Sequence, residues 1–172
     1  MKKIIITLIV FTTISQGINA QDTTRSRSDN ALQLSFGVNA AAPLGDNSKT
    51  SAFIIGGDLM AAFSLSDNFK VTGSAGIDSR INKGGVVNTI YYAPMLAGLR
   101  FYFTDRIFVS EQAGCSLALT KGLDGVFTNQ LGIGARLSNT SDILVAYKSL
   151  FGKDGAKDFN TLAIRLAYVF GR

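Results

Sequence analysis

The sequence offers few side chains that could carry out acid–base, nucleophilic or metal chemistry. Its 172 residues include no histidine and one cysteine, which removes the commonest proton-transfer and metal-binding groups. Lys148 and Ser149 could in principle form a nucleophile–base pair, but adjacent residues of a strand point to opposite faces. No glycine-rich phosphate loop follows a strand pattern. We therefore expect no enzyme active site, no metal and no cofactor.

A set of charged residues remains, and its members stand inside segments that are otherwise apolar and strand-like: Asp58, Arg100, Glu111, Arg136, Lys148 and Arg165. All but one oppose the bulky apolar face of their segment, so they are expected to point into the interior of the fold. An unpaired charge in an interior costs several kcal/mol. We expect these residues to pair into a structural polar plug, with a proton or ion path as the alternative.

Glu111 is the exception in this set. Simple alternation places it with Val109 on the more apolar face of its segment. A change of one residue in the preceding turn, Thr104–Arg106, would reverse that parity. Because a carboxylate on an apolar surface is unfavourable, we expect Glu111 inside, near Arg100 or Arg136.

The segment that positions Arg165 shows the pattern most clearly. It alternates bulky apolar residues with small or polar ones, and the bulky set is Leu162, Ile164, Leu166, Tyr168 and Phe170. Successive side chains of a strand point to opposite faces. The alternation therefore predicts a strand with one bulky apolar face and one small or polar face.

The same alternation recurs along the chain. It predicts eight strands at about 32–39, 52–64, 69–79, 89–103, 107–119, 126–137, 143–151 and 160–170. Short and longer connections between them strictly alternate, as in barrels whose two ends face different compartments. Pro94 falls within the fourth strand, where a bulge would relieve the hydrogen-bond ladder.

Composition separates a membrane barrel from a soluble one. The chain is 47% hydrophobic and 17% charged, against about 25% charged residues in soluble domains. Beyond the N-terminus no segment has the ~18 uninterrupted apolar residues of a spanning helix, whereas ~9–11 residues suffice for a tilted strand. We predict an all-β fold over 31–172: an eight-stranded antiparallel up-and-down transmembrane β-barrel with short periplasmic turns and modest extracellular loops.

Aromatic residues are expected to form two belts at the two membrane interfaces, where amphipathic rings are favoured. One belt lies by the short turns and the C-terminus: Phe63, Phe69, Phe101, Tyr102, Phe103, Phe108, Tyr168 and Phe170. The other lies by the longer loops: Phe53, Tyr91, Tyr92, Phe127, Phe151 and Phe159. The alternative fold is a soluble, lipocalin-like periplasmic barrel that binds an apolar ligand.

The N-terminus predicts export. Lys2 and Lys3 precede the apolar run 4–11, which suits a secretory signal peptide over 1–20, cleaved after Ala20. Residues 21–30 are polar and are expected to form a flexible periplasmic leader. Without Lys2 and Lys3 the chain keeps 15 basic and 12 acidic residues, a net charge of +3, which does not favour nucleic acid as a partner. The lone Cys115 cannot form an internal disulfide and is expected to be a small buried filler.

Three segments carry a resemblance to a known family: L-S-D-N-F at 65–69, L-R-F-Y-F-T-D-R-I-F-V at 99–109 and the terminal L-A-Y-V-F at 166–170. They resemble the small outer-membrane β-barrel domain proteins, relatives of OmpX and of the OmpA transmembrane domain, often labelled "porin family". The resemblance implies an outer-membrane location, outer-membrane lipid as surroundings, a structural or interaction role, and envelope protein partners that the sequence does not identify. A lipid-modifying outer-membrane enzyme is the less favoured reading, because the families of that kind rely on a histidine.

The word "porin" does not imply a diffusion pore here. Side chains just fill the interior of an eight-stranded barrel, so we expect a closed lumen.

Overall fold

The computed structural model describes residues 32–83, 89–120, 122–152 and 158–170. The expected signal peptide (1–20) and leader (21–30) lie outside the described residues. The elements are β1 (Leu32–Pro43), α2 (Asn47–Thr50), β2 (Ser51–Ser64), β3 (Phe69–Asn82), β4 (Thr89–Tyr102), β5 (Ile107–Ala118), β6 (Val126–Arg136), β7 (Ser141–Phe151) and β8 (Phe159–Phe170).

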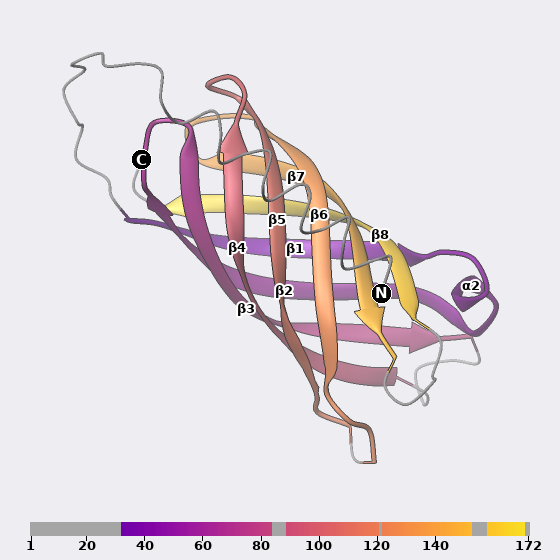
Figure 1. Ribbon diagram of the computed structural model, residues 1–172. Helices are drawn as coiled ribbons and strands as arrows, with labels where there is room; N and C mark the ends of the chain where they lie inside the picture. The colour runs from indigo at the N-terminus through magenta and orange to yellow at the C-terminus, as the bar shows by residue number, and fades with distance from the viewer. Residues whose placement is uncertain (1–31, 84–88, 121, 153–157, 171–172) are drawn as a thin grey trace, which may run out of the picture.

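The strands close into one barrel. Each strand pairs antiparallel with the next along the chain, and β1 pairs with β8. Figure 1 shows the eight strands wrapped around a common axis at a marked tilt. The predicted fold, an eight-stranded antiparallel up-and-down barrel, is confirmed.

The two ends of the barrel differ in their connections. Residues 65–68, 103–106 and 137–140 form tight turns at one end, called here the short-turn end. The other connections lie at the opposite end, called the long-loop end, where α2 is found (Figure 1). No helix within the described ranges is long and apolar enough to cross a membrane.

Strand bounds differ from the expected ones mainly at the long-loop end. β1 continues to Pro43, and the N–H of Leu44 still donates to the carbonyl of Asn160 at 2.9 Å. β3 continues to Asn82. Ladder hydrogen bonds need only backbone groups, so the sheet runs on after the apolar alternation that predicted it has ended.

Pro94 is accommodated without the expected bulge. The pairing of β4 with β3 omits Ala93 and Pro94 but resumes in the same register, while Pro94 still pairs with Ser116 of β5. The irregularity in register lies elsewhere, in β2 between Ser51 and Phe53.

The two faces of the sheet have opposite character. On β8, Leu162 to Phe170 alternate between bulky residues about half exposed and residues at most 8% exposed. Two clusters of buried apolar side chains lie in the interior, one near each end of the barrel. The cluster near the short turns contains Tyr102, Phe108, Leu144 and Ala146, and the cluster near the long loops contains Ala41, Ile54, Leu150, Phe159 and Ala163.

The expected aromatic belts are therefore partly wrong. Tyr102, Phe108 and Phe159 are buried inside the barrel. Position along the chain places a ring at one end of a barrel, but the parity of the strand decides whether the ring faces in or out.

Candidate functional site

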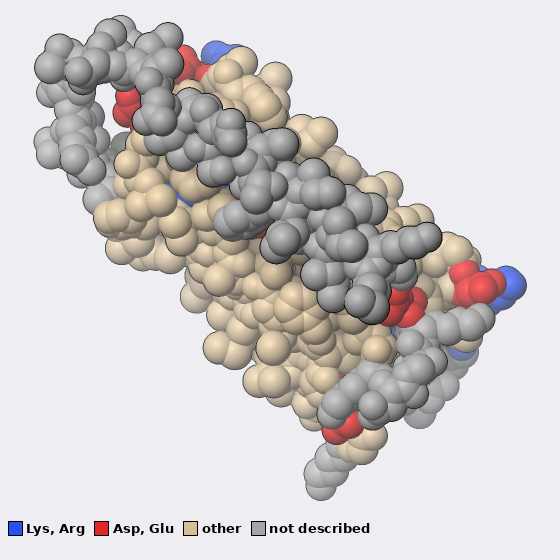
Figure 2. Space-filling view, in the orientation of Figure 1, with Lys and Arg blue, Asp and Glu red and all other residues tan. Residues whose placement is uncertain are grey.

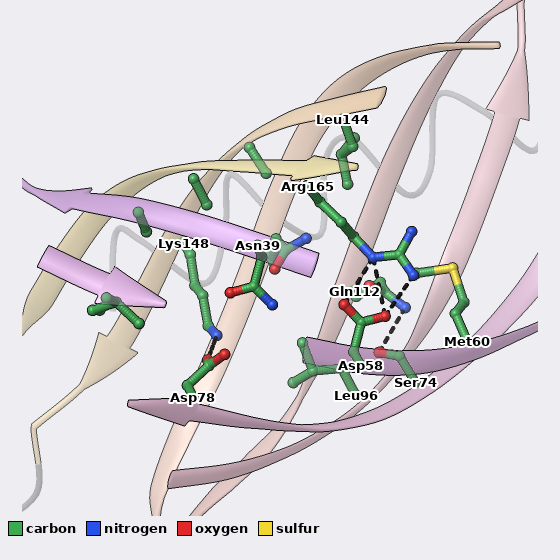
Figure 3. Close-up of a pocket in the computed structure, with 15 residues that line it drawn as sticks. Asn39, Asp58, Met60, Ser74, Asp78, Leu96, Gln112, Leu144, Lys148 and Arg165 are labelled. Carbon is green, nitrogen blue, oxygen red and sulfur yellow. Dashed lines mark hydrogen bonds and ion pairs between the residues drawn. The ribbon is translucent and has the colours of Figure 1, made fainter. Parts of the chain in front are cut away.

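Within the part of the chain that the structure describes, opposite charges pair in the interior of the barrel. Three such pairs are Arg100 with Asp142, Arg165 with Asp58, and Lys148 with Asp78. Figure 3 shows the last two pairs, with the side chains of each pair pointing toward one another across the lumen. The polar interior formed by these pairs is the candidate functional site.

The Arg165–Asp58 pair is bidentate. Nε of Arg165 lies 2.8 Å from Oδ2 of Asp58, and Nη2 lies 2.5 Å from Oδ1. Arg165 is on β8 and Asp58 on β2, so the pair reaches over β1. At that crossing β1 supplies Gly37, where a Cβ atom would run into the Arg165 guanidinium. The glycine leaves the space that lets two non-adjacent strands form a planar, two-point contact.

The Lys148–Asp78 pair spans the full lumen. Its two residues lie on β7 and β3, which are opposite each other in the closed order of strands, and Nζ lies 2.5 Å from Oδ2. The second oxygen of Asp78 is buried and has no hydrogen-bond partner among the described residues. A cavity of about 40 Å³ adjoins both ion pairs, and Asn39, Gln112 and Gln130 add polar groups to its wall.

The Arg100–Asp142 pair lies toward the short-turn end. Arg100 is 3% exposed; its Nη1 lies 3.2 Å from Asp142 and donates to the Tyr102 hydroxyl at 3.4 Å. Its guanidinium stacks over the Phe108 ring, 4.1 Å from the centroid. Arg136 also faces inward and lies over the Tyr102 ring, at 5.4 Å.

Five of the six charges singled out in the sequence thus lie on the inner face: Asp58, Arg100, Arg136, Lys148 and Arg165. Two of their carboxylate partners, Asp78 and Asp142, were not singled out. Alternation with Thr72 and Ser74 could have placed Asp78 inside. Asp142 was assigned to a turn because of the polar run S-N-T-S-D, but β7 begins at Ser141 and orients Asp142 inward.

The expectation for Glu111 is wrong. Glu111 pairs in register with Leu99 of β4 and Leu131 of β6, both on the outer face, while Ser110 and Gln112 are 2% exposed on the inner face. The four-residue connection 103–106 leaves simple alternation intact, and alternation places Glu111 on the outer face. The expectation of an inward Glu111, which relied on the cost of a carboxylate on an apolar surface, was therefore wrong. In the strands described, Glu111 is the one charged residue at an outward position.

Lys148 and Ser149, the pair considered and disfavoured in the sequence, do not form a nucleophile–base pair. Lys148 points inward to Asp78, whereas Ser149 donates to Oδ1 of Asn160 at 2.9 Å on the other face. Over the described ranges no group of three or more histidine, cysteine or acidic residues could hold a metal ion. Cys115 is exposed on the outer face, so the expectation of a buried filler is also wrong.

The outer wall between the ends of the barrel is apolar. In Figure 2 the red and blue atoms gather mainly at the two ends, and the wall in view between them is predominantly tan. Large apolar side chains stand out from all eight strands; examples are Leu59 (64%), Ile133 (64%) and Leu166 (49%). Water would meet all of these groups if the wall were in solvent.

Comparison with known proteins supports the fold. No protein-family model matches the chain, and no curated protein matches it either. Among solved structures it is similar to Ail, the attachment invasion locus protein of Yersinia pestis, at 16% identity and a TM-score of 0.58, covering 81% of this chain and 97% of that one. It is similar to the N-terminal β-barrel domain of Pseudomonas aeruginosa OprF at 11% identity and a TM-score of 0.57, covering 80% and 97%.

A de novo designed transmembrane β-barrel is also similar, at 12% identity and a TM-score of 0.53, covering 83% of this chain and 98% of the design. At these identities the similarity shows the small-barrel fold alone. All three structures share the closed barrel, natural or designed, and none of them transfers a ligand or partner to this chain.

Proposed function

We propose that the protein is an integral outer-membrane β-barrel with a structural or interaction role and a closed, polar-plugged lumen. The observation that carries this proposal is the division of its side chains, with apolar residues outside and paired charges inside. A soluble barrel has the reverse division, because water contacts its outer face.

The outer wall supports the membrane location. Its outward positions are predominantly apolar over the height of the described strands, and Glu111 is the single charge placed on them. Strands of 11 to 14 residues exceed the ~9–11 residues that cross a bilayer at a tilt. Two similar proteins point the same way: Ail is an outer membrane protein whose backbone structure was determined in a phospholipid bilayer nanodisc, and the designed barrel is a transmembrane β-barrel.

The interior supports a closed lumen. Apolar clusters fill it near both ends, and ion pairs cross it between them. The described cavity beside those pairs has a volume of about 40 Å³, room for a few water molecules. A continuous aqueous channel of the kind found in barrels with 16 or more strands does not fit this interior.

The two alternatives find less support. A lipocalin-like barrel needs a polar exterior and an open apolar cavity, whereas here the exterior is apolar and the described interior cavity is small and has two ion pairs in its wall. For an outer-membrane enzyme, the one nucleophile–base candidate, Lys148 with Ser149, is split between the two faces.

Cell fractionation and gel mobility test the proposal. We expect the protein in the outer-membrane fraction, with a faster-migrating form before boiling than after, because a closed ladder of strands resists detergent. Recovery in the soluble periplasmic fraction, with mobility unaffected by heat, would overturn the membrane assignment and favour the soluble barrel.

A further inference from the structure

Glu111 is an outward-facing carboxylate on a wall that the proposed function places in lipid. It lies at an outward position between Leu99 and Leu131, and it forms no ion pair or hydrogen bond with the described part of the chain. A carboxylate on the lipid-facing surface of a barrel is unfavourable, and the penalty grows with depth. Membrane proteins keep such residues where a partner satisfies them.

An apolar groove opens in the wall next to Glu111, on the side away from the short turns. Its floor is a row of small residues in register across four strands: Ala61, Gly73, Ala97 and Ala113. Leu59 and Met95 form part of its higher rim, and its volume is about 730 Å³. A Cβ atom added at Gly73 would meet nothing within 4 Å, so the floor is open above this residue.

A second copy of the chain is a poor occupant for this groove. The outward positions of the described strands offer one charge, and it is acidic. Two copies related by a twofold axis along the membrane normal would bring two Glu111 carboxylates to the same depth. The occupant must instead supply a cation.

The height of Glu111 indicates where that cation comes from. Glu111 is the fifth residue of β5, counted from the short-turn end. With a rise of about 3.3 Å per residue and a tilt of about 45°, its Cα lies roughly 9 Å above the start of the strand. The carboxylate therefore lies within one leaflet and can extend toward its headgroups, where the ammonium groups of amine-bearing lipids are abundant.

We propose that this groove binds a membrane lipid with a primary ammonium headgroup, and that Glu111 accepts hydrogen bonds from that ammonium. The lipid belongs to the leaflet at the short-turn end, and one acyl chain lies over Ala113 and Ala97. Charge complementarity selects the headgroup, and the small-residue floor gives the chain a close contact. This inference rests on the proposed membrane location.

The chain offers a reporter in the groove itself, because Cys115 lines the groove and is the single cysteine of the sequence. We would label Cys115 with a bimane fluorophore and insert the protein into phosphatidylglycerol vesicles. Dibrominated phosphatidylethanolamine or dibrominated phosphatidylcholine, at equal mole fraction, would then serve as quencher. The choline headgroup keeps the positive charge but has no N–H donor.

We expect about two- to fivefold stronger quenching per mole by the ethanolamine lipid, the range that one partly exposed ionic hydrogen bond supplies. Glu111→Gln keeps the size of the side chain and should bring the ratio to one. Gly73→Leu should weaken quenching by both lipids, because it fills the groove. The matched control carries Cys115→Ala and Val145→Cys, which places the label on the outward face of β7, and should show no preference.

Equal quenching by the two lipids in the unchanged protein, or a preference that survives Glu111→Gln, would overturn the lipid site. Quenching by neither lipid in the labelled protein, together with a disulfide between Cys115 residues of two chains in a parallel unlabelled sample, would put a second copy in the groove and overturn it too. Failure of the protein to enter vesicles or to show heat-modifiable mobility would count against the membrane assignment itself, so the two failures can be told apart.

Discussion

At the scale of single residues, the interior combines ion pairs between residues far apart in the sequence with glycines that leave space for them. The three ion pairs join residues 107, 70 and 42 positions apart. Glycines provide the room they need: Gly37 leaves space for Arg165, and a Cβ on Gly56 would collide with Asp78. Arg165 and Asp78 therefore depend on a neighbouring glycine as well as on a charged partner.

Removing one member of a buried pair should be costly. Asp58→Asn leaves the Arg165 side chain, 7% exposed, with its bidentate partner weakened, and we expect a loss of about 3–5 kcal/mol in the free energy of unfolding. Urea titration in vesicles, followed by gel mobility without boiling, measures it. The control is Asp46→Asn, which weakens the exposed Asp46–Lys49 pair and should cost under ~1 kcal/mol. Equal, small effects of both changes would show that the interior pair contributes little.

Two strand glycines, Gly134 on the inner face and Gly73 on the outer face, should respond differently to an added methyl group. At Gly134 the new Cβ would enter the Phe108 ring, which is fully buried beneath the Arg100 guanidinium. We expect Gly134→Ala to destabilise the barrel by about 1–3 kcal/mol through overpacking. Gly73→Ala meets open space and should be neutral or slightly stabilising. The same urea titration compares them, and a tolerated Gly134→Ala would mean that the Phe108 ring can move aside.

At the scale of elements, alternation along the strands was the most informative feature of the sequence. It predicted the number of strands, their order and the inward position of Arg165, because a period of two fixes the face of every residue once one is known. It could not predict strand ends such as Asn82, where pairing continues without an apolar face. Glu111 was misplaced when an energetic argument was preferred to parity.

The partners of the charges were harder to predict than their faces. Parity states that Lys148 and Asp78 both point inward, but the contact across the lumen depends on strand tilt and register. These are properties of the closed barrel. The inward position of Asp142 could not be predicted either, because the first residues of β7 belong to a polar run that is typical of a turn.

The facing of β8 can be tested by a pair of substitutions at adjacent positions. Leu166 is 49% exposed on the outer face, and Ala167 is 7% exposed on the inner face. Leu166→Arg should hinder insertion, since an arginine on the lipid face near mid-bilayer costs about 2–4 kcal/mol. Ala167→Ser places a hydroxyl in a polar interior and should cost little. Folding yield in vesicles, measured by heat-modifiable gel mobility, compares the two variants. A lower folding yield for Ala167→Ser than for Leu166→Arg would mean that the bulky apolar face of β8 points into the barrel.

At the scale of the whole molecule, side chains occupy the described interior at three successive levels. Near the short turns, Tyr102, Phe108 and Leu144 are at most 4% exposed and pack together. At the next level the Lys148–Asp78 pair crosses the lumen, and the Arg165–Asp58 pair lies against its wall over β1. Near the long loops a second apolar cluster contains Ile54, Leu150 and Phe159. In the proposed closed lumen a passing ion would have to displace all three layers, and the apolar layer near the long loops offers it no ligands.

We therefore expect no steady ion conductance in planar bilayers, only small and irregular events. The described cavity of about 40 Å³ holds a few water molecules at most, whereas conduction needs a continuous aqueous path. An open multi-stranded porin, added to the same bilayer afterwards, is the control for membrane quality and detection. A steady current of porin size from this protein alone would contradict the closed lumen. It would require either that the apolar layers at Phe108 and Phe159 open in the membrane, or that several barrels surround a pore between them, and cross-linking through the outward Cys115 would distinguish the two.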